Sequence, residues 1–302
     1  MCGVIGVIYK NTEELGLASV GVDLIKMLES LEHRGRDSTG VTIGGVENKS
    51  DYIVRFRIED ENSNGLEILA KETSNIGGVI EYSGFTNGFG KICVNYEGDV
   101  SKLAHTISDV EGIEVDSIGT NSEIVKDVGD ATQLNNRHLI GEIKGTHGIG
   151  HVRMATESKI DVSHSHPFWA YPFPDISVVH NGQLTNYHSL RRKYQDRGYK
   201  FQTGNDSEII SVFLAERIES GLSLDEAIQE SLEVLDGTFT YLVSTNDGIG
   251  YAKDSWSAKP LVIMETTNRV ASASEETALL SVFQDEIDRF EPQEKECMTW
   301  LV

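Results

Sequence analysis

The stretch MCGVIGVIY, residues 1–9, decides the first step of the fold. Its part from Gly3 to Tyr9 is short, apolar and rich in valine and isoleucine, which is typical of a buried β-strand. The strand begins almost at the first residue, so we expect the N-terminal end to be held by neighbouring strands. Because an initiator methionine is normally removed before a small residue, we expect Cys2 to become the first residue.

A cysteine in that place carries a thiol and a free α-amine on one residue. The amine titrates near 7.7–8.0 and the thiol near 8.5, so the amine can take the thiol proton without a separate histidine. Cys2 is therefore a candidate nucleophile with its own base. The alternative is that Cys2 is only a small apolar residue leading into a buried strand.

Three further stretches contain residues suited to chemistry on a small substrate. In VVHNGQL, residues 178–184, the Asn181 side chain and the Gly182 N–H can stabilise an oxyanion, although Asn-Gly is also a common turn. Arg153, in GHVRMAT, can form a bidentate pair with a carboxylate, or it is a surface arginine. Asp206, in GNDSE, can accept an ammonium group or belong to an ordinary helix cap.

Composition excludes several classes of protein. The 302 residues include 26 Lys+Arg and 48 Asp+Glu, a net charge of −22, which opposes nonspecific nucleic-acid binding. No run approaches 18 apolar residues, and no basic region precedes the apolar start, so we expect neither a membrane helix nor a signal peptide. These features predict a cytoplasmic protein without a membrane partner.

The remaining cysteines and histidines give no metal prediction. Cys93 and Cys297 lie in strand-like runs, where a free cysteine usually behaves as a small buried residue. The three cysteines form no CxxC pair, which opposes a disulfide framework and a zinc ribbon. His164 and His166 form an HxH pair upstream of His180, but spacing alone does not place them as zinc ligands.

The order of patterns along the chain favours layered α+β packing. A helical pattern at 22–31 follows the first strand, and the strand and helix patterns at 47–140 suggest an inserted α+β lobe. Helical patterns then occupy 187–198, 206–220 and 223–235, and strand-like runs continue to the end. Strands, then helices, then strands suit this packing better than a βαβ repeat.

Five motifs in this order resemble one family. MCGVIG, HRGRDSTG at 33–40, GIGHVRMAT at 148–156, HNGQLTN at 180–186 and NDSE at 205–208 are similar to the class II, N-terminal nucleophile amidotransferases that hydrolyse glutamine. The similarity spans residues 1–46 and about 140–302. The runs 148–158 and 163–168 and the pair Lys259-Pro260 more closely resemble stand-alone subunits related to the amidotransferase domain of glutamate synthase.

The resemblance implies a fold and a catalytic set. The fold would be the four-layered αββα N-terminal nucleophile hydrolase fold, with one type-2 amidotransferase domain over 1–302 and an insertion of unknown role at 47–140. Cys2 would be the nucleophile, and Asn181 with the Gly182 N–H would form the oxyanion hole.

The resemblance also implies the substrate contacts. Arg153 would hold the glutamine α-carboxylate and Asp206 the α-ammonium, with Thr156 as a neighbouring contact. Arg34 and Gly35 would belong to the loop that closes over the N-terminal residue. A free amino acid presents two opposite charges, so a site for it requires one cation and one anion.

The expected reaction is hydrolysis of L-glutamine to glutamate and ammonia through a Cys2 thioester. The ammonia would pass to a separate glutamate synthase-type subunit, and the two subunits would form a hetero-oligomer. By resemblance, that partner would carry FMN and an iron–sulfur cluster, while this chain would bind no cofactor. The alternatives are a subunit of a related pathway, such as N-methylglutamate synthase, and a non-catalytic glutamine sensor.

Overall fold

The computed structural model describes residues 2–10, 12, 16–58, 64–155, 159–283 and 288–302. Within these residues the strands form three sheets, and all their neighbouring strands are antiparallel. In spatial order, the first sheet contains β15 (Arg289–Phe290), β13 (Val262–Glu265), β14 (Arg269–Ala273), β1 (Gly3–Tyr9), β8 (His147–Arg153), β2 (Ser38–Gly44) and β7 (Ser122–Val128). The second contains β16 (Cys297–Leu301), β12 (Gly248–Lys253), β11 (Gly237–Ser244), β10 (Ser177–Leu184) and β9 (Phe168–Trp169).

Strand β1 forms at the predicted place and lies inside the first sheet, between β14 and β8. Its side chains alternate between two hydrophobic cores, because successive residues of a strand point to opposite faces. Ile5 and Val7 pack against helices, whereas Val4 and Ile8 pack against residues of the second sheet. Residue 2 has the same parity as Val4, which places Cys2 on the side of the second sheet.

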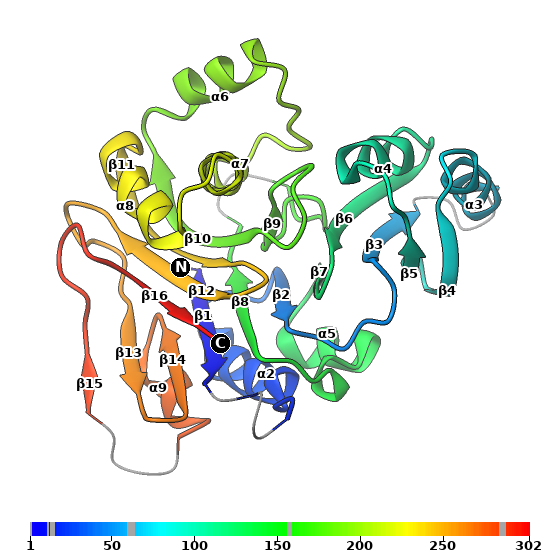
Figure 1. Ribbon diagram of the computed structural model, residues 1–302. Helices are drawn as coiled ribbons and strands as arrows, with labels where there is room; N and C mark the ends of the chain where they lie inside the picture. Colours follow the sequence, from blue (N-terminus) through cyan, green and yellow to red (C-terminus); the bar gives the residue numbers. More distant parts are fainter. Residues whose placement is uncertain (1, 11, 13–15, 59–63, 156–158, 284–287) are drawn as a thin grey trace.

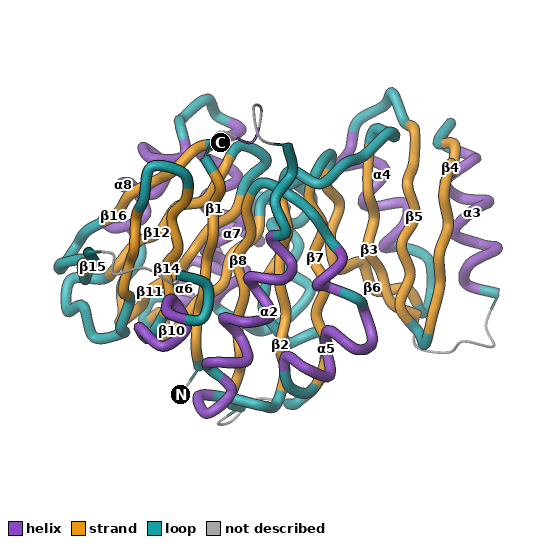
Figure 2. Tube along the Cα trace, turned by 90° about the horizontal axis from the view of Figure 1, so that it is seen from below, coloured by secondary structure: helices purple, strands orange, loops and turns teal. Residues whose placement is uncertain are grey.

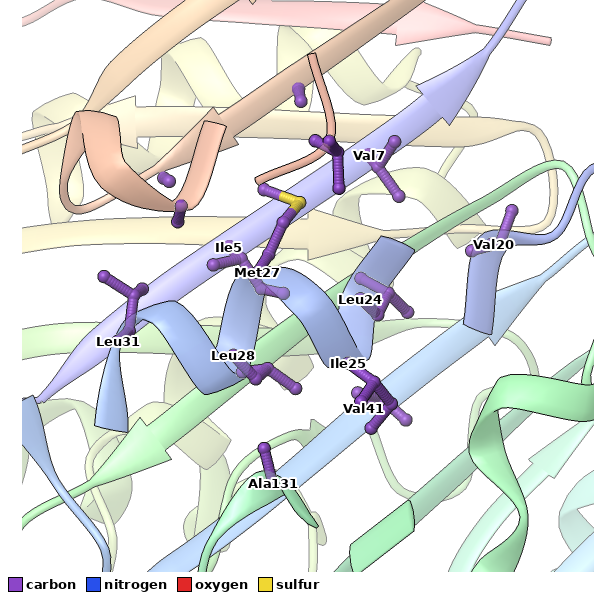
Figure 3. Packing of buried hydrophobic residues seen from close by; sticks show 14 of the residues in the cluster. Ile5, Val7, Val20, Leu24, Ile25, Met27, Leu28, Leu31, Val41 and Ala131 are labelled. Atoms are coloured by element: carbon purple, nitrogen blue, oxygen red, sulfur yellow. The ribbon is translucent and has the colours of Figure 1, made fainter. Parts of the chain in front are cut away.

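Two helical layers cover the outer faces of these sheets. Helix α2 (Val20–Ser30) lies across the first sheet, and Figure 3 shows Leu24 and Leu28 of α2 close to Ile5 of β1 and Val41 of β2. The short helix α9 (Glu276–Leu280) packs on the same face. Helices α7 (Ser207–Glu219) and α8 (Leu224–Val234) share a core with the second sheet, and α6 (Tyr187–Asp196) borders it. The predicted αββα layering is therefore confirmed (Figure 1).

The third sheet forms a lobe beside this body, seen at the right of Figures 1 and 2. Its strands, in spatial order, are β4 (Val79–Thr86), β5 (Phe89–Asn95), β3 (Tyr52–Ile58) and β6 (Ile113–Gly119). Helices α3 (Gly65–Asn75) and α4 (Val100–Ser108) complete its core. Two aromatic rings of the body, Trp169 and Tyr171, are buried in the same core.

The range that we expected for the lobe, 47–140, is wider than this sheet. Strand β7 pairs with β2 along its whole length, from Ser38 opposite Val128 to Gly44 opposite Ser122. Helix α5 (Ala131–His138) then contributes Ala131 to the core under α2. Residues 122–138 thus belong to the first sheet and its covering helices, although Ile124 of β7 is buried in the core of the lobe. Among the described helices, none has the length and apolar character needed to span a membrane.

Candidate active site

A cavity of about 440 Å³ lies where the ends of three strands meet the start of α7. Cavities of this size accommodate small ligands. Six of the predicted site residues line it, although they are spread over most of the sequence: Cys2, Arg34, Arg153, Asn181, Gly182 and Asp206. Thr156 lies outside the described residues.

Cys2 is held from two sides through its backbone. Its carbonyl oxygen accepts hydrogen bonds from Arg34 Nε at 2.9 Å and from Asn181 Nδ2 at 3.2 Å, while its Sγ lies 3.7 Å from the Met154 carbonyl oxygen. Arg34 is itself paired with Glu275, and these contacts hold the pKa of the Glu275 carboxyl below its usual range, against the opposing effect of burial. Arg34 therefore anchors residue 2 in this structure.

Asn181 and Gly182 lie within β10, whose pairing with β11 continues through Leu184 opposite Gly237. The Asn-Gly pair is thus not the hairpin turn that its local sequence allows. Gly182 has φ of +134°, and a Cβ at this position would lie 1.9 Å from the Thr238 carbonyl oxygen. Only glycine fits this close approach of β10 to β11, and Gly182 lines the cavity together with Asn181.

Arg153 and Asp206 place opposite charges on the wall of the cavity. Arg153 ends β8, is buried, and donates from Nη1 to the Lys159 carbonyl oxygen at 3.0 Å. The Asp206 side chain forms no capping bond with α7; its Oδ2 accepts from the Leu184 N–H at 2.8 Å. The carboxylate is 22% exposed, which leaves it accessible to a ligand.

Gly35 contributes through close packing. A Cβ on Gly35 would lie 2.4 Å from the carbonyl carbon of Arg153, so the loop after Arg34 lies directly against the end of β8. Asp37, further along this loop, accepts a hydrogen bond from the Ala155 N–H at 2.7 Å. The loop thereby fixes the backbone on both sides of Met154.

Sequence analysis weighed His166 and His180 only as zinc ligands and did not find their contacts at the cavity, which both residues line. Ser207 Oγ lies 2.9 Å from His166 Nε2 and 3.0 Å from His180 Nδ1, and the rings of His151 and His166 stack at 4.1 Å. Burial lowers the pKa of His151 to about 3 and that of His166 well below its ordinary value, so both rings are neutral near pH 7. The HxH pattern was the available signal, but it did not identify Ser207 as the shared partner.

Within the described part of the chain, no group of three histidine, cysteine or acidic residues is arranged to hold a metal ion. The cavity instead combines a thiol, amide donors and two opposite charges. Such a set can bind a zwitterionic amino acid by its charged end and expose a side-chain carbonyl to the sulfur. Lys259 and Pro260 also line this cavity.

Comparison with known proteins finds relatives that cover almost the whole chain. The family described as "Glutamine amidotransferase domain" matches residues 151–281. A Methanothermobacter thermautotrophicus protein that bears a provisional glutamine amidotransferase name is 39% identical over 305 residues, covering 97% of this chain and 98% of its own. The glutamine amidotransferase-like protein GlxB of Rhizobium meliloti is 32% identical, covering 99% and 98%.

Solved structures agree on the fold. The glutamine phosphoribosylpyrophosphate amidotransferase of B. subtilis, complexed with ADP and GMP, matches 99% of this chain and 47% of its own with a TM-score of 0.60 and 19% identity. A structure described as the allosteric regulatory enzyme of purine biosynthesis matches with a TM-score of 0.63 and 20% identity, covering 99% and 46%. At this identity the likeness concerns the fold.

Proposed function

The chain belongs to the glutamine amidotransferases, which take nitrogen from the glutamine side chain, and we propose that its Cys2 attacks the side-chain amide of glutamine. We propose further that a separate glutamate synthase-type subunit uses the ammonia that is released. The observation that carries the catalytic part is the shared cavity. It brings Cys2, the Asn181–Gly182 pair, Arg153 and Asp206 to one small space from distant parts of the sequence.

The two charges orient the substrate. Arg153 binds the glutamine α-carboxylate, and Asp206 binds the α-ammonium. An Arg–carboxylate pair is directional because the guanidinium presents two parallel N–H donors. Binding the charged end this way turns the γ-carboxamide toward Cys2, which converts the attack into an intramolecular step.

The reaction proceeds in two halves. The α-amine of Cys2 takes the thiol proton, and the sulfur bonds to glutamine Cδ while the carbonyl electron pair moves to oxygen. Asn181 Nδ2 and the Gly182 N–H stabilise this oxyanion. The new Cys2 ammonium returns a proton to the amide nitrogen, the C–N bond breaks, and ammonia leaves a γ-glutamyl thioester. Water then adds to the thioester carbon, and the thiol leaves to give glutamate.

The first test is intact-mass spectrometry before and after treatment with a glutamine-analogue diazoketone. We expect the protein without Met1, one adduct on Cys2, and loss of glutamine hydrolysis in Cys2→Ala. Cys93 and Cys297 provide matched controls, because both are half-buried and burial raises the pKa of each thiol. A retained Met1 with full hydrolysis would refute the mechanism, whereas a retained Met1 with glutamine binding alone would favour the sensor alternative.

The acceptor subunit is the second part of the proposal. Its support is the similarity of runs 148–158 and 163–168 and of Lys259-Pro260 to stand-alone glutamate synthase-related subunits, with Lys259 and Pro260 at the cavity. In this proposal the partner carries FMN and an iron–sulfur cluster, this chain carries neither, and the two chains form a hetero-oligomer.

Labelled glutamine tests this assignment. The purified complex, supplied with amide-15N glutamine, 2-oxoglutarate and reductant, is expected to place 15N in the α-amine of new glutamate. Formation of N-methylglutamate from methylamine, with no labelled glutamate, would assign the subunit to the alternative pathway. Both outcomes leave the glutaminase assignment to be judged by the Cys2 experiment.

A further inference from the structure

We infer that strand β6 of the lobe and Lys126 together clamp the two segments that form the floor of the glutamine cavity, so that Lys126 is a positioning residue for glutamine binding. This inference rests on the proposed function of that cavity. The two segments are 163–167, which contains His166, and 202–208, which contains Asp206. It assigns the lobe a role in the reaction.

Lys126 makes the central contact with the 163–167 segment. It projects from β7, is buried, and donates from Nζ to the carbonyl oxygens of Ser165 at 3.1 Å and Pro167 at 3.3 Å. Its Nζ also lies 3.8 Å from Asp116 Oδ1 of β6. Burial lowers the pKa of Lys126, and the nearby Asp116 carboxylate opposes this shift. A buried Nζ requires hydrogen-bond partners, so it fixes the two carbonyls on either side of His166.

A second grip holds the start of the same segment. Arg57 of β3 donates from Nε to both carboxylate oxygens of Asp116, at 3.1 and 3.0 Å, and pairs with Glu114 at 2.6 Å. Glu114 in turn accepts a hydrogen bond from Ser163 Oγ at 2.7 Å. The 163–167 segment is thus attached to the lobe at Ser163, through Glu114. It is also attached at Ser165 and Pro167, through Lys126 and Asp116.

A third contact connects β6 to the other segment. Gln202 Nε2 donates to the carbonyl oxygen of Val115 at 3.3 Å. The backbone N–H groups of Gln202 and Thr203 both donate to the Glu208 carboxylate at 2.9 Å, which closes the segment on itself. Strand β6 therefore contacts the piece of chain that presents Asp206.

The two segments meet under the cavity, where His166 Nε2 and Ser207 Oγ are 2.9 Å apart. On one side the segment packs directly against β2, since a Cβ on Gly40 would lie 2.2 Å from the His166 carbonyl oxygen. On the other side a cavity of about 260 Å³ lies between the lobe and parts of both segments, and Lys126, Ser163 and Gln202 line it. Without the Lys126 ammonium, the segment has space to move toward the lobe.

This arrangement predicts an effect on binding that spares the chemical step. Cys2 precedes β1 and Asn181 lies in β10, neither of which pairs with a lobe strand. The clamp instead acts on residues next to Asp206. In the proposed function, Asp206 binds the substrate equally in the ground state and in the transition state. Loss of such uniform binding raises KM and leaves kcat unchanged.

The test uses the full chain and compares three variants. Lys126→Met keeps most of the length of the side chain and removes the amine that holds the two carbonyls. We expect KM for glutamine to rise roughly tenfold with kcat within about threefold. Gln202→Ala removes an exposed side chain from the second segment and provides a variant that retains the buried charges. It should raise KM in the same direction, by about threefold.

Arg55→Met is the matched control. Arg55 of β3 also joins the lobe to β7, through a 2.7 Å pair with the buried Glu123, but its partners lie outside both segments. We expect a comparable fall in Tm with KM unchanged. If wild-type protein hydrolyses glutamine and Lys126→Met leaves KM unchanged, or if Arg55→Met raises KM equally, the inference is wrong while the proposed function stands.

Hydrogen exchange distinguishes a failure of the clamp inference from a failure of the proposed function. Peptides covering 163–169 and 202–208 should exchange faster in Lys126→Met than in Arg55→Met. If wild-type protein releases no ammonia from glutamine, the proposed function fails, and this comparison still decides whether the clamp exists. Equal exchange in the two variants would overturn it.

Discussion

Replacing Asp206 with asparagine provides a direct test of how the cavity recognises its substrate. Asp206 Oδ2 accepts the Leu184 N–H at 2.8 Å, and its Oδ1 lies 3.6 Å from His180 Nδ1. An asparagine carbonyl oxygen can accept the same N–H bond, so we expect the local structure to persist. The substitution removes only the negative charge that the proposal assigns to the glutamine α-ammonium.

The expected magnitude follows from the type of bond that is lost. A hydrogen bond to a charged group contributes about 1.5–3 kcal/mol. The carboxylate is 22% exposed, so solvent screens part of the attraction and the lower half of that range is the better estimate. At about 1.4 kcal/mol per factor of ten, kcat/KM for glutamine should fall roughly 10- to 40-fold, mainly through KM.

The assay compares glutamine with 4-carbamoylbutanoate, which has the same carboxamide and carboxylate but no α-amine. Asp206→Asn should lose activity toward glutamine and show no loss toward the analogue. Asp236→Asn is the control, because this exposed aspartate accepts a hydrogen bond from Thr185, the residue that follows Leu184. An equal loss toward both substrates would refute the assignment of Asp206 to the ammonium.

Three other outcomes follow from the structure. Asn181→Ala should lower kcat about 100- to 1,000-fold with KM retained, measured as initial rates of ammonia release; an unchanged kcat would remove the amide from the oxyanion site. Gly40→Ala places a methyl group 2.2 Å from the His166 carbonyl oxygen, so urea unfolding should show a loss of about 1–3 kcal/mol, and unchanged stability would contradict this packing. Burial lowers the pKa of His147 to about 4 and that of His151 to about 3, from an ordinary value of 6.5. Below pH 6.5 the unfolded chain therefore binds more protons than the folded chain. As the pH falls from 6.5 toward 4, the free energy of unfolding should decrease by about 1.4 kcal/mol per pH unit and per histidine. A flat profile in urea titrations would show that these rings are not buried neutral.

Part of the fold was predictable because its signals are local. The apolar run at Gly3 identifies β1, and the helical spacing of Leu24 and Leu28 identifies α2. Motif order also selected residues that the structure brings to one cavity, although their catalytic roles remain predictions. What made this possible is that each motif lies at or near the end of an element, so placing the elements places the side chains.

The rest depends on contacts between distant residues, which local patterns do not encode. Asn-Gly favours a turn in isolation, but pairing of β10 with β11 holds it in a strand. Strand β7 has an ordinary strand pattern, and nothing in it specifies that its partner is β2 rather than a lobe strand. The grip of Lys126 on two carbonyl oxygens depends on which backbone lies within reach of its ammonium.

The burial of Trp169 and Tyr171 in the core of the lobe matters for anyone who wishes to shorten this enzyme. Excising 52–119 to obtain a minimal amidase would expose both rings to water. It would also remove Asp116, the carboxylate neighbour of the Lys126 side chain. The shortened protein would have an exposed aromatic patch, and such patches promote aggregation. A reduced version must therefore replace those two rings with polar residues and redesign Lys126 at the same time.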